Sequence, residues 1–214
     1  MRGKLIVIEG IDGSGKSVQA ALLNIALERL GHAVQIIKAR ETKQNVALKK
    51  FLKDFDITTD SLAFMFLYQA LHRKQYDRTK AALDTGVTVI ADRWDASFFV
   101  YHYLFGPLSK RPKRLLKMLN RLAFENLEPD LCCFLNTTVS TAIKTVSTAI
   151  KRRIARGDVI SSIKEEAEFY DKVAAEYAKL LTQKSYYVTF DGSQSIEQVH
   201  RQIIEAVMPI ITRG

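Results

Sequence analysis

The 214-residue sequence contains only two cysteines, and the two are adjacent at Cys132 and Cys133. They lie in the apolar run Leu131–Leu135. Because neighbouring residues of a strand point to opposite faces, we expect no disulfide between them. Two unpaired thiols in a core are typical of a protein that works in a reducing compartment, so we expect a cytoplasmic location.

Long apolar runs are also missing. No stretch approaches the 18 apolar residues that suggest a membrane-spanning helix. The chain enters its first apolar run at Leu5, so we expect no signal peptide. We see no linker, so we expect one domain over residues 1–214, whose 47% hydrophobic and 26% charged residues are ordinary for a globular protein.

The formal net charge is +9. Such an excess can serve nucleic-acid binding, a membrane surface, or a pocket that holds two phosphorylated ligands. The basic residues are dispersed, with local clusters near 110–117 and 151–156, and no nucleic-acid-binding motif accompanies them. We therefore expect small-molecule partners, with no nucleic acid and no membrane.

Five short apolar runs predict buried strands, and segments with helical periodicity separate them. This alternation favours a five-stranded parallel sheet with helices on both faces. Ligands of such sheets bind beyond the carboxyl ends of the strands, where Glu9, Arg40, Asp92 and Asn136 fall. The first helix is expected to end at Gly31. The expected strands are Leu5–Glu9, Ala33–Lys38, Val87–Ala91, Leu131–Leu135 and Tyr186–Phe190, and the expected helices cover about 16–30, 61–83, 96–104, 113–126, 138–155, 164–183 and 195–211.

A complete phosphate-loop motif, G-x-x-x-x-G-K-[ST], directly follows the first expected strand. Its glycines let backbone N–H groups turn toward phosphate oxygens, and the N-terminus of the next helix adds partial positive charge. Lys16 is expected to reach the β- and γ-phosphates of a nucleotide, and Ser17 to bind Mg²⁺. The nucleotide-binding residues are Gly10, Ile11, Asp12, Gly13, Ser14, Gly15, Lys16 and Ser17.

A second polar group, Asp92 and Arg93, comes at the end of the third expected strand. A carboxylate in this position can hold Mg²⁺ through water, and an arginine can grip a phosphate with two hydrogen bonds. Taken alone, the pair could equally be a surface ion pair. Opposite a phosphate loop, the phosphate-binding interpretation is favoured.

One segment is repeated letter for letter: Thr138–Lys144 and Thr145–Lys151 both read TVSTAIK. Seven added residues lengthen a helix by about two turns and nearly preserve its apolar face. The repeat is either a lengthened arm that repositions the residues after it, or a tandem duplication tolerated at a helix end. We favour the second interpretation.

Together these motifs resemble those of the thymidylate kinases. Ile8–Gln19 is close to the phosphate-loop signature of that family, and Asp92–Ser97 followed by Tyr101 is similar to its D-R-[YW]-x-x-S-x-x-x-Y element. The resemblance runs the length of the chain and is most specific in these two segments. It implies the P-loop NTPase fold, α/β in three layers, with a helical lid over about 152–163.

Two weaker similarities lie in the C-terminal half. Arg156–Asp158, with the helix that comes after them, looks like the lid, and Phe190–Gln194 resembles the loop that packs against adenine.

The resemblance implies that ATP and Mg²⁺ serve the reaction ATP + dTMP → ADP + dTDP. The acceptor phosphate is already an anion, so no general base is needed, and catalysis is mainly positioning and charge neutralisation. Lys16 would neutralise the donor and Arg93 would hold the acceptor phosphate in line. Ser17 and Asp92 would hold the metal.

The resemblance implies several further substrate contacts. Asp12 would bond the sugar 3′-hydroxyl, unless it only stabilises the loop as an Asx turn. Arg40 would be a second arginine on the acceptor phosphate, unless it is a solvent-facing loop residue. Ser97 and Tyr101 belong to the signature after the third strand and are expected on the substrate side.

Gly13 stands where some family members carry an arginine that stabilises the transition state. Members with glycine there take this charge from the lid. The candidates are Arg152, Arg153 and Arg156, of which we favour Arg153 and Arg156; the alternative is a solvated basic helix face. The second Asp-Arg pair usual in the lid is replaced by Ile160-Ser161.

Base recognition also departs from the family. Tyr68 stands at the aromatic position that stacks on thymine, and His72 stands where an arginine is usual. Arg73 is the next residue, turned about 100° around the helix. Tyr68 could instead pack in the core at helical spacing, so base specificity stays open.

Two other functions remain. A deoxynucleoside kinase would need a carboxylate base, for which Glu41 is available. A nucleotide-binding homologue with weakened catalysis is the other alternative, because the lid has changed. The family is usually a homodimer, and Ser61–Leu71 and Leu115–Phe124 could supply the apolar face.

Overall fold

The computed structural model describes residues 2–38, 61–105, 113–137 and 163–212. The expected helix over 138–155, the repeated heptad, the lid region, Arg40, Glu41, Arg152, Arg153 and Arg156 lie outside these residues. The strands are β1 (Leu5–Gly10), β2 (Val34–Lys38), β3 (Thr88–Asp92), β4 (Leu131–Asn136) and β5 (Tyr187–Asp191). The helices are α1 (Lys16–Arg29), α3 (Ser61–Asp84), α4 (Asp95–Phe105), α5 (Lys113–Phe124), α7 (Ile163–Leu181) and α8 (Ile196–Thr212).

The five strands form one sheet in the order β2-β3-β1-β4-β5, and every pairing is parallel. The parallel five-stranded sheet that the apolar runs predict is therefore confirmed, with strand bounds shifted by about one residue. β1 lies in the centre, between β3 and β4. The chain crosses from one side of β1 to the other after β3, which places the ligand-binding crevice of the fold at the carboxyl ends of β1 and its neighbours.

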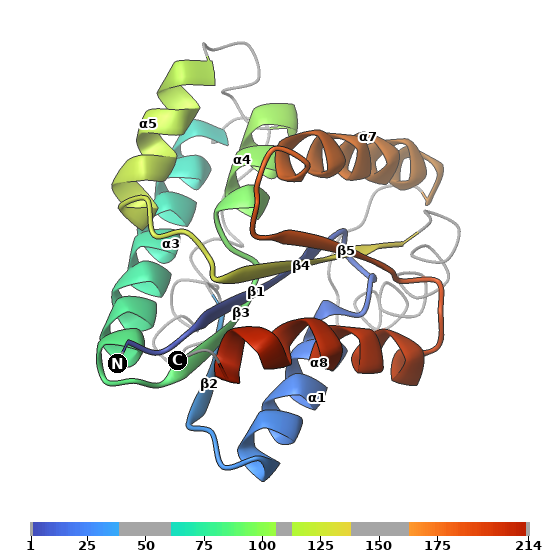
Figure 1. The fold of residues 1–214 in the computed structure, drawn as a ribbon. Coiled ribbons are helices and arrows are strands. Elements are labelled where there is room, and N and C mark those ends of the chain that lie inside the picture. The colour runs from blue at the N-terminus through green and yellow to red at the C-terminus, as the bar shows by residue number, and fades with distance from the viewer. Residues whose placement is uncertain (1, 39–60, 106–112, 138–162, 213–214) are drawn as a thin grey trace, which may run out of the picture.

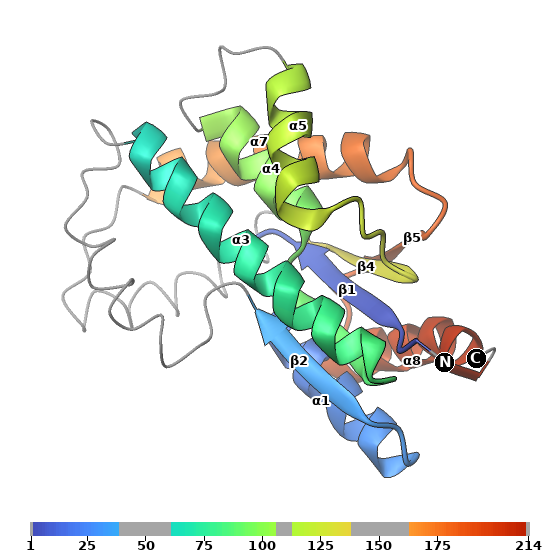
Figure 2. The same cartoon turned by 90° about the vertical axis from the view of Figure 1, so that its left-hand side faces the viewer.

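Helices cover both faces of the sheet. Figure 1 shows α1 and α8 on one side and α3, α4, α5 and α7 on the other, and Figure 2 shows the same layers after a quarter turn. Alternate residues of β1 join opposite cores: Leu5 and Val7 pack toward the larger group of helices, and Ile6 and Ile8 toward α1 and α8. This is the three-layer α/β/α architecture of the P-loop NTPases.

The adjacent cysteines obey the same alternation. Cys132 packs in the core that includes α7, and Cys133 packs in the core that includes α1 and α8. Both are buried free thiols, so the prediction that they do not pair is confirmed. None of the helices in the described ranges combines the length and the apolar character that crossing a bilayer requires.

The ends of two helices depend on left-handed residues. Gly31 has φ +84°, its N–H donates to Glu28 O, and His32 N–H donates to Leu27 O, so α1 ends in a Schellman motif at the expected glycine. α5 ends at Phe124, two residues before the expected end, because Glu125 and Asn126 have φ +47° and +56°. These two residues lack the glycine that usually announces such a turn in a sequence.

We expect Gly31→Ala to destabilise the protein by about 1 kcal/mol, because a Cβ is disfavoured at positive φ. Apart from the neighbouring residues of the chain, no heavy atom of the described residues lies within 4 Å of the Cβ position, so the cost arises from the backbone and not from a clash. Urea unfolding measures the change. Gly31→Asn is the control and should cost less, since Asn tolerates this conformation. Equal stability of Gly31→Ala and the unaltered protein would contradict the assignment.

Candidate functional site

The phosphate-loop motif forms a tight turn between β1 and α1. α1 begins at Lys16, as expected, after Gly15 at φ +88°. Gly10 has φ +149°, and a Cβ there would lie 2.6 Å from Ser14 Oγ and 2.9 Å from Leu135 O. Only glycine allows β1, β4 and the loop to approach this closely. The loop therefore presents the N-terminus of α1 at the carboxyl edge of the sheet.

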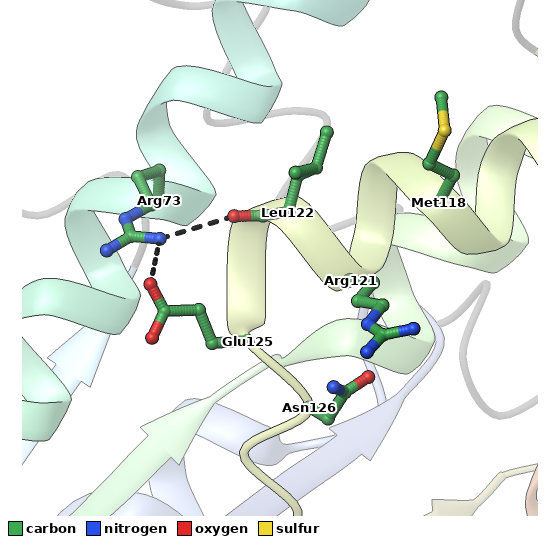
Figure 3. A pocket seen from close by; sticks show the side chains of 6 residues that line it. All are labelled: Arg73, Met118, Arg121, Leu122, Glu125 and Asn126. Atoms are coloured by element: carbon green, nitrogen blue, oxygen red, sulfur yellow. Dashed lines mark hydrogen bonds and ion pairs between the residues drawn. The ribbon is translucent and has the colours of Figure 1, made fainter.

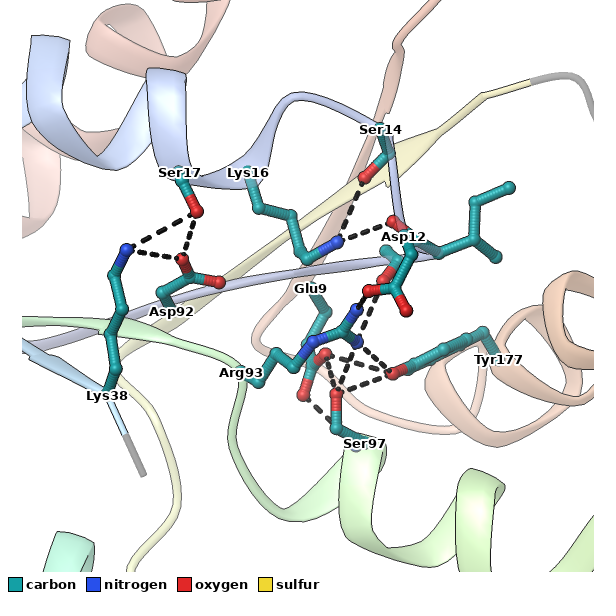
Figure 4. A network of polar contacts seen from close by, with 12 residues as sticks. Glu9, Asp12, Ser14, Lys16, Ser17, Lys38, Asp92, Arg93, Ser97 and Tyr177 are labelled. Carbon is teal, nitrogen blue, oxygen red and sulfur yellow. Dashed lines mark hydrogen bonds and ion pairs between the residues drawn. The ribbon is translucent and has the colours of Figure 1, made fainter. Parts of the chain in front are cut away.

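Lys16 lies inside the loop and is buried. Its ammonium group donates to Ile11 O and, at 3.4 Å, to Ser14 Oγ (Figure 4). Burial, together with the positive charge of Arg93, lowers the pKa of Lys16 to about 7. An anion bound in the loop would therefore stabilise the charged form of this buried amine.

The structure brings the two expected metal-binding residues together. Ser17 Oγ donates to Asp92 Oδ2 at 2.7 Å. Lys38, the last residue of β2, places its Nζ 3.0 Å from the same carboxylate oxygen and 3.3 Å from Ser17 Oγ (Figure 4). Lys38 is paired with Asp92 in the sheet register, which explains why the two side chains meet. We did not predict a role for Lys38, although a cation at the end of an apolar strand is a signal in the sequence.

Glu9 is the centre of a buried network at the end of β1. It is fully buried and accepts hydrogen bonds from the N–H groups of Trp94 and Ser97, at 2.8 and 3.1 Å. The hydroxyls of Ser97 and Tyr177 donate to its second oxygen at 2.6 and 3.2 Å. Burial raises the pKa of Glu9, and the charge of Arg93 and these hydrogen bonds partly offset the effect. Glu9 thus joins β1 to the N-terminus of α4 and to α7.

Arg93 lies between this network and the phosphate loop (Figure 4). One terminal nitrogen donates to Gly10 O, Ser97 Oγ and Tyr177 OH at 3.1, 3.0 and 3.2 Å. The other pairs with the carboxylate of Asp12. Two residues of the phosphate loop therefore hold the guanidinium in place.

The surroundings of Arg93 favour its charged form. Burial by itself would lower the pKa of Arg93, but Tyr101 and Asp12 contribute to holding it well above its usual value. The guanidinium carbon lies 5.2 Å from the centre of the Tyr101 ring, within the range of a cation–π contact. Tyr101 and Ser97, both expected on the substrate side, are therefore in direct contact with Arg93.

Of the three residues expected to bind the base, two lie close together and the third points elsewhere. His72 is buried, with its ring 5.4 Å from the rings of Phe98 and of Phe124, and Tyr68 lies 6.4 Å from it between ring centres. Arg73 points elsewhere, pairing with Asp77 at 2.9 Å and, on the α5 side, with Glu125 at 2.7 Å. The structure thus does not bring Arg73 to the phosphate loop.

The loop after β5 is held by hydrogen bonds within itself, and the residue that begins α8 directly after it is bonded to α1. Asp191 accepts from the N–H and hydroxyl of Ser193 at 2.9 and 2.6 Å. Gln19, on the first turns of α1, donates to Ile196 O at 3.0 Å. The start of α8, two residues after the segment expected to meet adenine, is therefore attached to the helix that follows the phosphate loop.

The sequence does not reveal the contacts of two residues of the site, Tyr177 and Glu9. Tyr177 reads as an ordinary core residue of a helix, and its contact with Glu9 joins residues far apart in the chain. Glu9 was placed at the edge of the sheet, but a polar residue at a strand end does not reveal its partners. Arg40, Arg153 and Arg156 lie outside the described residues, and their positions stay predictions.

Comparison with known proteins agrees with this geometry. The sequence model of the thymidylate kinase family matches residues 8–203. The chain is 30% identical to the thymidylate kinase of Caldanaerobacter subterraneus subsp. tengcongensis over 97% of this chain and 96% of that one. It is 30% identical to that of Fervidobacterium nodosum over 94% and 96%, and 27% identical to that of Colwellia psychrerythraea over 98% and 96%. With a family match over most of its length and relatives covered almost end to end, the chain belongs to the thymidylate kinase family.

Proposed function

We propose that this protein transfers the γ-phosphate of ATP to dTMP, giving ADP and dTDP. The observation that carries the proposal is the attachment of Arg93 to the phosphate loop through Gly10 O and Asp12. A donor-side cation, Lys16, and an acceptor-side cation, Arg93, thereby belong to one unit. Family membership and the names of the relatives support the same reaction.

The residues would act by positioning and by charge. Lys16 and the N–H groups at the start of α1 stabilise the donor phosphates, and Arg93 holds the acceptor phosphate opposite them. The nucleophile is a phosphate oxygen that is already charged, so the site needs no base. Glu9 is buried and bound by four donors, which suits a structural role better than proton transfer.

The oxygen atoms of Ser17 and Asp92 fit Mg²⁺, which prefers hard oxygen ligands. Mg²⁺ in proteins is usually coordinated by one or two side chains, with phosphate and water oxygens completing its ligands. The ammonium group of Lys38 beside them indicates that the site favours a cation. When bound, Mg²⁺ would neutralise charge on the transferred phosphate.

The remaining assignments rest on the family resemblance. We propose that Asp12, Ser97 and Tyr101 lie around the dTMP phosphate and sugar, and that Tyr68 and His72 face the base. Three further arginines, all outside the described residues, are proposed to complete the charge around the two phosphates: Arg40, Arg153 and Arg156. The two free cysteines support a cytoplasmic location.

We propose a homodimer through the outer face of α3 and α5. Phe66, Met118 and Leu122 are more than half exposed there, at 55%, 52% and 62%. A shallow pocket lies on the same face (Figure 3). Apolar surface of this kind on a helix pair is typical of a protein interface. The pocket is lined by Arg73, Met118, Arg121, Leu122, Glu125 and Asn126.

The reaction is tested by a coupled ADP-release assay with ATP and Mg²⁺, comparing dTMP with thymidine. We expect turnover of dTMP, which is lost with EDTA. Arg93→Ala should lower kcat/KM for dTMP by at least about 100-fold, with a small change in the KM for ATP.

The matched control for that assay is Arg201→Ala, which removes an exposed arginine of α8 and should leave the kinetics unchanged. Turnover of thymidine in preference to dTMP would favour the deoxynucleoside kinase, and no dTMP-dependent ADP would favour a catalytically weakened homologue.

The lowered pKa of Lys16 predicts that nucleotide binding takes up a proton. At pH 8, above the pKa of about 7, Lys16 is mostly neutral, and phosphate anions would raise its pKa and charge it. At pH 6 the group is already charged, so this uptake should vanish. Calorimetry of ADP binding with EDTA, in buffers that differ in ionisation enthalpy, measures the protons.

Lys16→Arg is the control for proton uptake, because arginine stays charged at both pH values. The uptake at pH 8 should disappear in this variant. Equal uptake by both proteins would show that another group takes the proton.

We expect Leu122→Glu to convert the dimer to a monomer, because a charge would be buried against the partner without a compensating contact. Light scattering after size-exclusion chromatography gives the mass. Ile25→Glu, on α1 and 45% exposed, is the control and should stay dimeric. A monomeric unaltered protein, or a dimeric Leu122→Glu variant, would contradict this interface.

A further inference from the structure

Arg93, the acceptor-side cation, has an unusual backbone conformation. Arg93 has φ +73°, in the left-handed region that residues with a side chain rarely adopt. A non-glycine residue in this region costs free energy and persists only where its surroundings hold it. The conformation of Arg93 therefore needs an explanation in its contacts.

Three hydrogen bonds hold this turn. The N–H of Arg93 donates to Ile8 O at 3.1 Å, and the next N–H, of Trp94, donates to Glu9 at 2.8 Å. The carbonyl oxygen of Arg93 accepts from Nε2 of Gln75 at 2.8 Å. The first two contacts come from β1, and the third comes from a side chain of α3.

Gln75 is buried, with 1% of its surface exposed. Its Oε1 atom has no hydrogen-bond partner among the described residues. A buried amide whose acceptor oxygen is left unused is expensive compared with an apolar side chain of similar size. Stability alone therefore gives a poor reason for glutamine at this position.

Gln75 lies on the same face of α3 as the residues that are proposed to bind the base. Tyr68, His72 and Gln75 recur at helical spacing, so they lie along one face of the helix. The same helix face that is proposed to meet the base thus also holds the backbone of Arg93.

We propose that Gln75 is a positioning residue for phosphoryl transfer: by binding the carbonyl of Arg93, it holds the left-handed turn that aims the guanidinium at the acceptor phosphate. This inference rests on the proposed function. It also implies that α3 and Arg93 move as one unit, so that placement of the base and placement of the phosphate are linked.

The principal test is Gln75→Met in the full chain, which removes the donor but nearly preserves length and volume. We expect kcat/KM for dTMP to fall about 10-fold to 100-fold, as for a misplaced catalytic group, with the KM for ATP unchanged within about twofold. In an Arg93→Ala background the same substitution should have almost no further effect, because the group that it positions is gone.

The matched control is Thr79→Val. Thr79 lies one turn further along α3, is fully buried, and its hydroxyl has no hydrogen-bond partner among the described residues. This substitution also removes a buried polar group from α3 but leaves the Arg93 turn intact, so kcat/KM for dTMP should not change. Gln75→Leu is a second variant in case Gln75→Met does not fold.

Trp94 provides a measurement that needs no turnover. It is the single tryptophan of the chain, comes directly after Arg93 and is fully buried. Loosening of the turn should raise the quenching of its fluorescence by acrylamide in Gln75→Met, by about twofold, and not in Thr79→Val.

The outcomes separate the two proposals. Loss of activity in Gln75→Met that disappears in the Arg93→Ala background supports the positioning role. An equal loss of kcat/KM for dTMP in both backgrounds, an unchanged kcat/KM in Gln75→Met, or unchanged quenching overturns it. If the unaltered protein does not phosphorylate dTMP but Trp94 responds as expected, the proposed function fails while the action of Gln75 on the Arg93 turn stands.

Discussion

The carboxylate of Glu9 is the interaction on which the site depends. A charge removed from water is costly unless hydrogen bonds and an opposite charge compensate it. Glu9 obtains both: two N–H groups from the start of α4, two hydroxyls, and the nearby guanidinium of Arg93. These hydrogen bonds hold β1, α4 and α7 together at Glu9. The phosphate loop, which leaves β1 directly after Glu9, thereby has a defined place relative to both helices.

Positive charge is distributed over the carboxyl ends of three neighbouring strands. Lys38 ends β2, Arg93 comes directly after β3, and Lys16 comes after β1 and the phosphate loop. Each of these cations already contacts an oxygen of the protein, namely Asp92, Asp12 and Ile11 O. Anionic ligands would therefore meet side chains that are held in position, which lowers the cost of ordering them on binding. These three cations contribute part of the positive charge behind the chain's net charge of +9.

The fold was predictable where local pattern and packing agree. Apolar runs predicted all five strands, since a parallel sheet is buried on both faces and tolerates few polar residues. The phosphate loop and Asp92–Arg93 were predictable because consecutive letters carry the chemistry. Tyr177 was not, because its role arises from a contact between α7 and β1 that no local pattern encodes. Arg73 is turned away from His72 around α3, but its partner Glu125, which comes directly after α5, is not evident from the sequence. The lid and the repeated heptad stay predictions.

The two buried thiols lie on opposite faces of the sheet. Cys132 and Cys133 are neighbours in the chain, but each reports on a different helical layer, because β4 directs one toward α7 and the other toward α1 and α8. Burial raises the pKa of both, which keeps them unreactive in the folded protein. A thiol reagent applied during partial unfolding would label each one only as its own layer opens. The order of labelling would reveal which side of the sheet separates first.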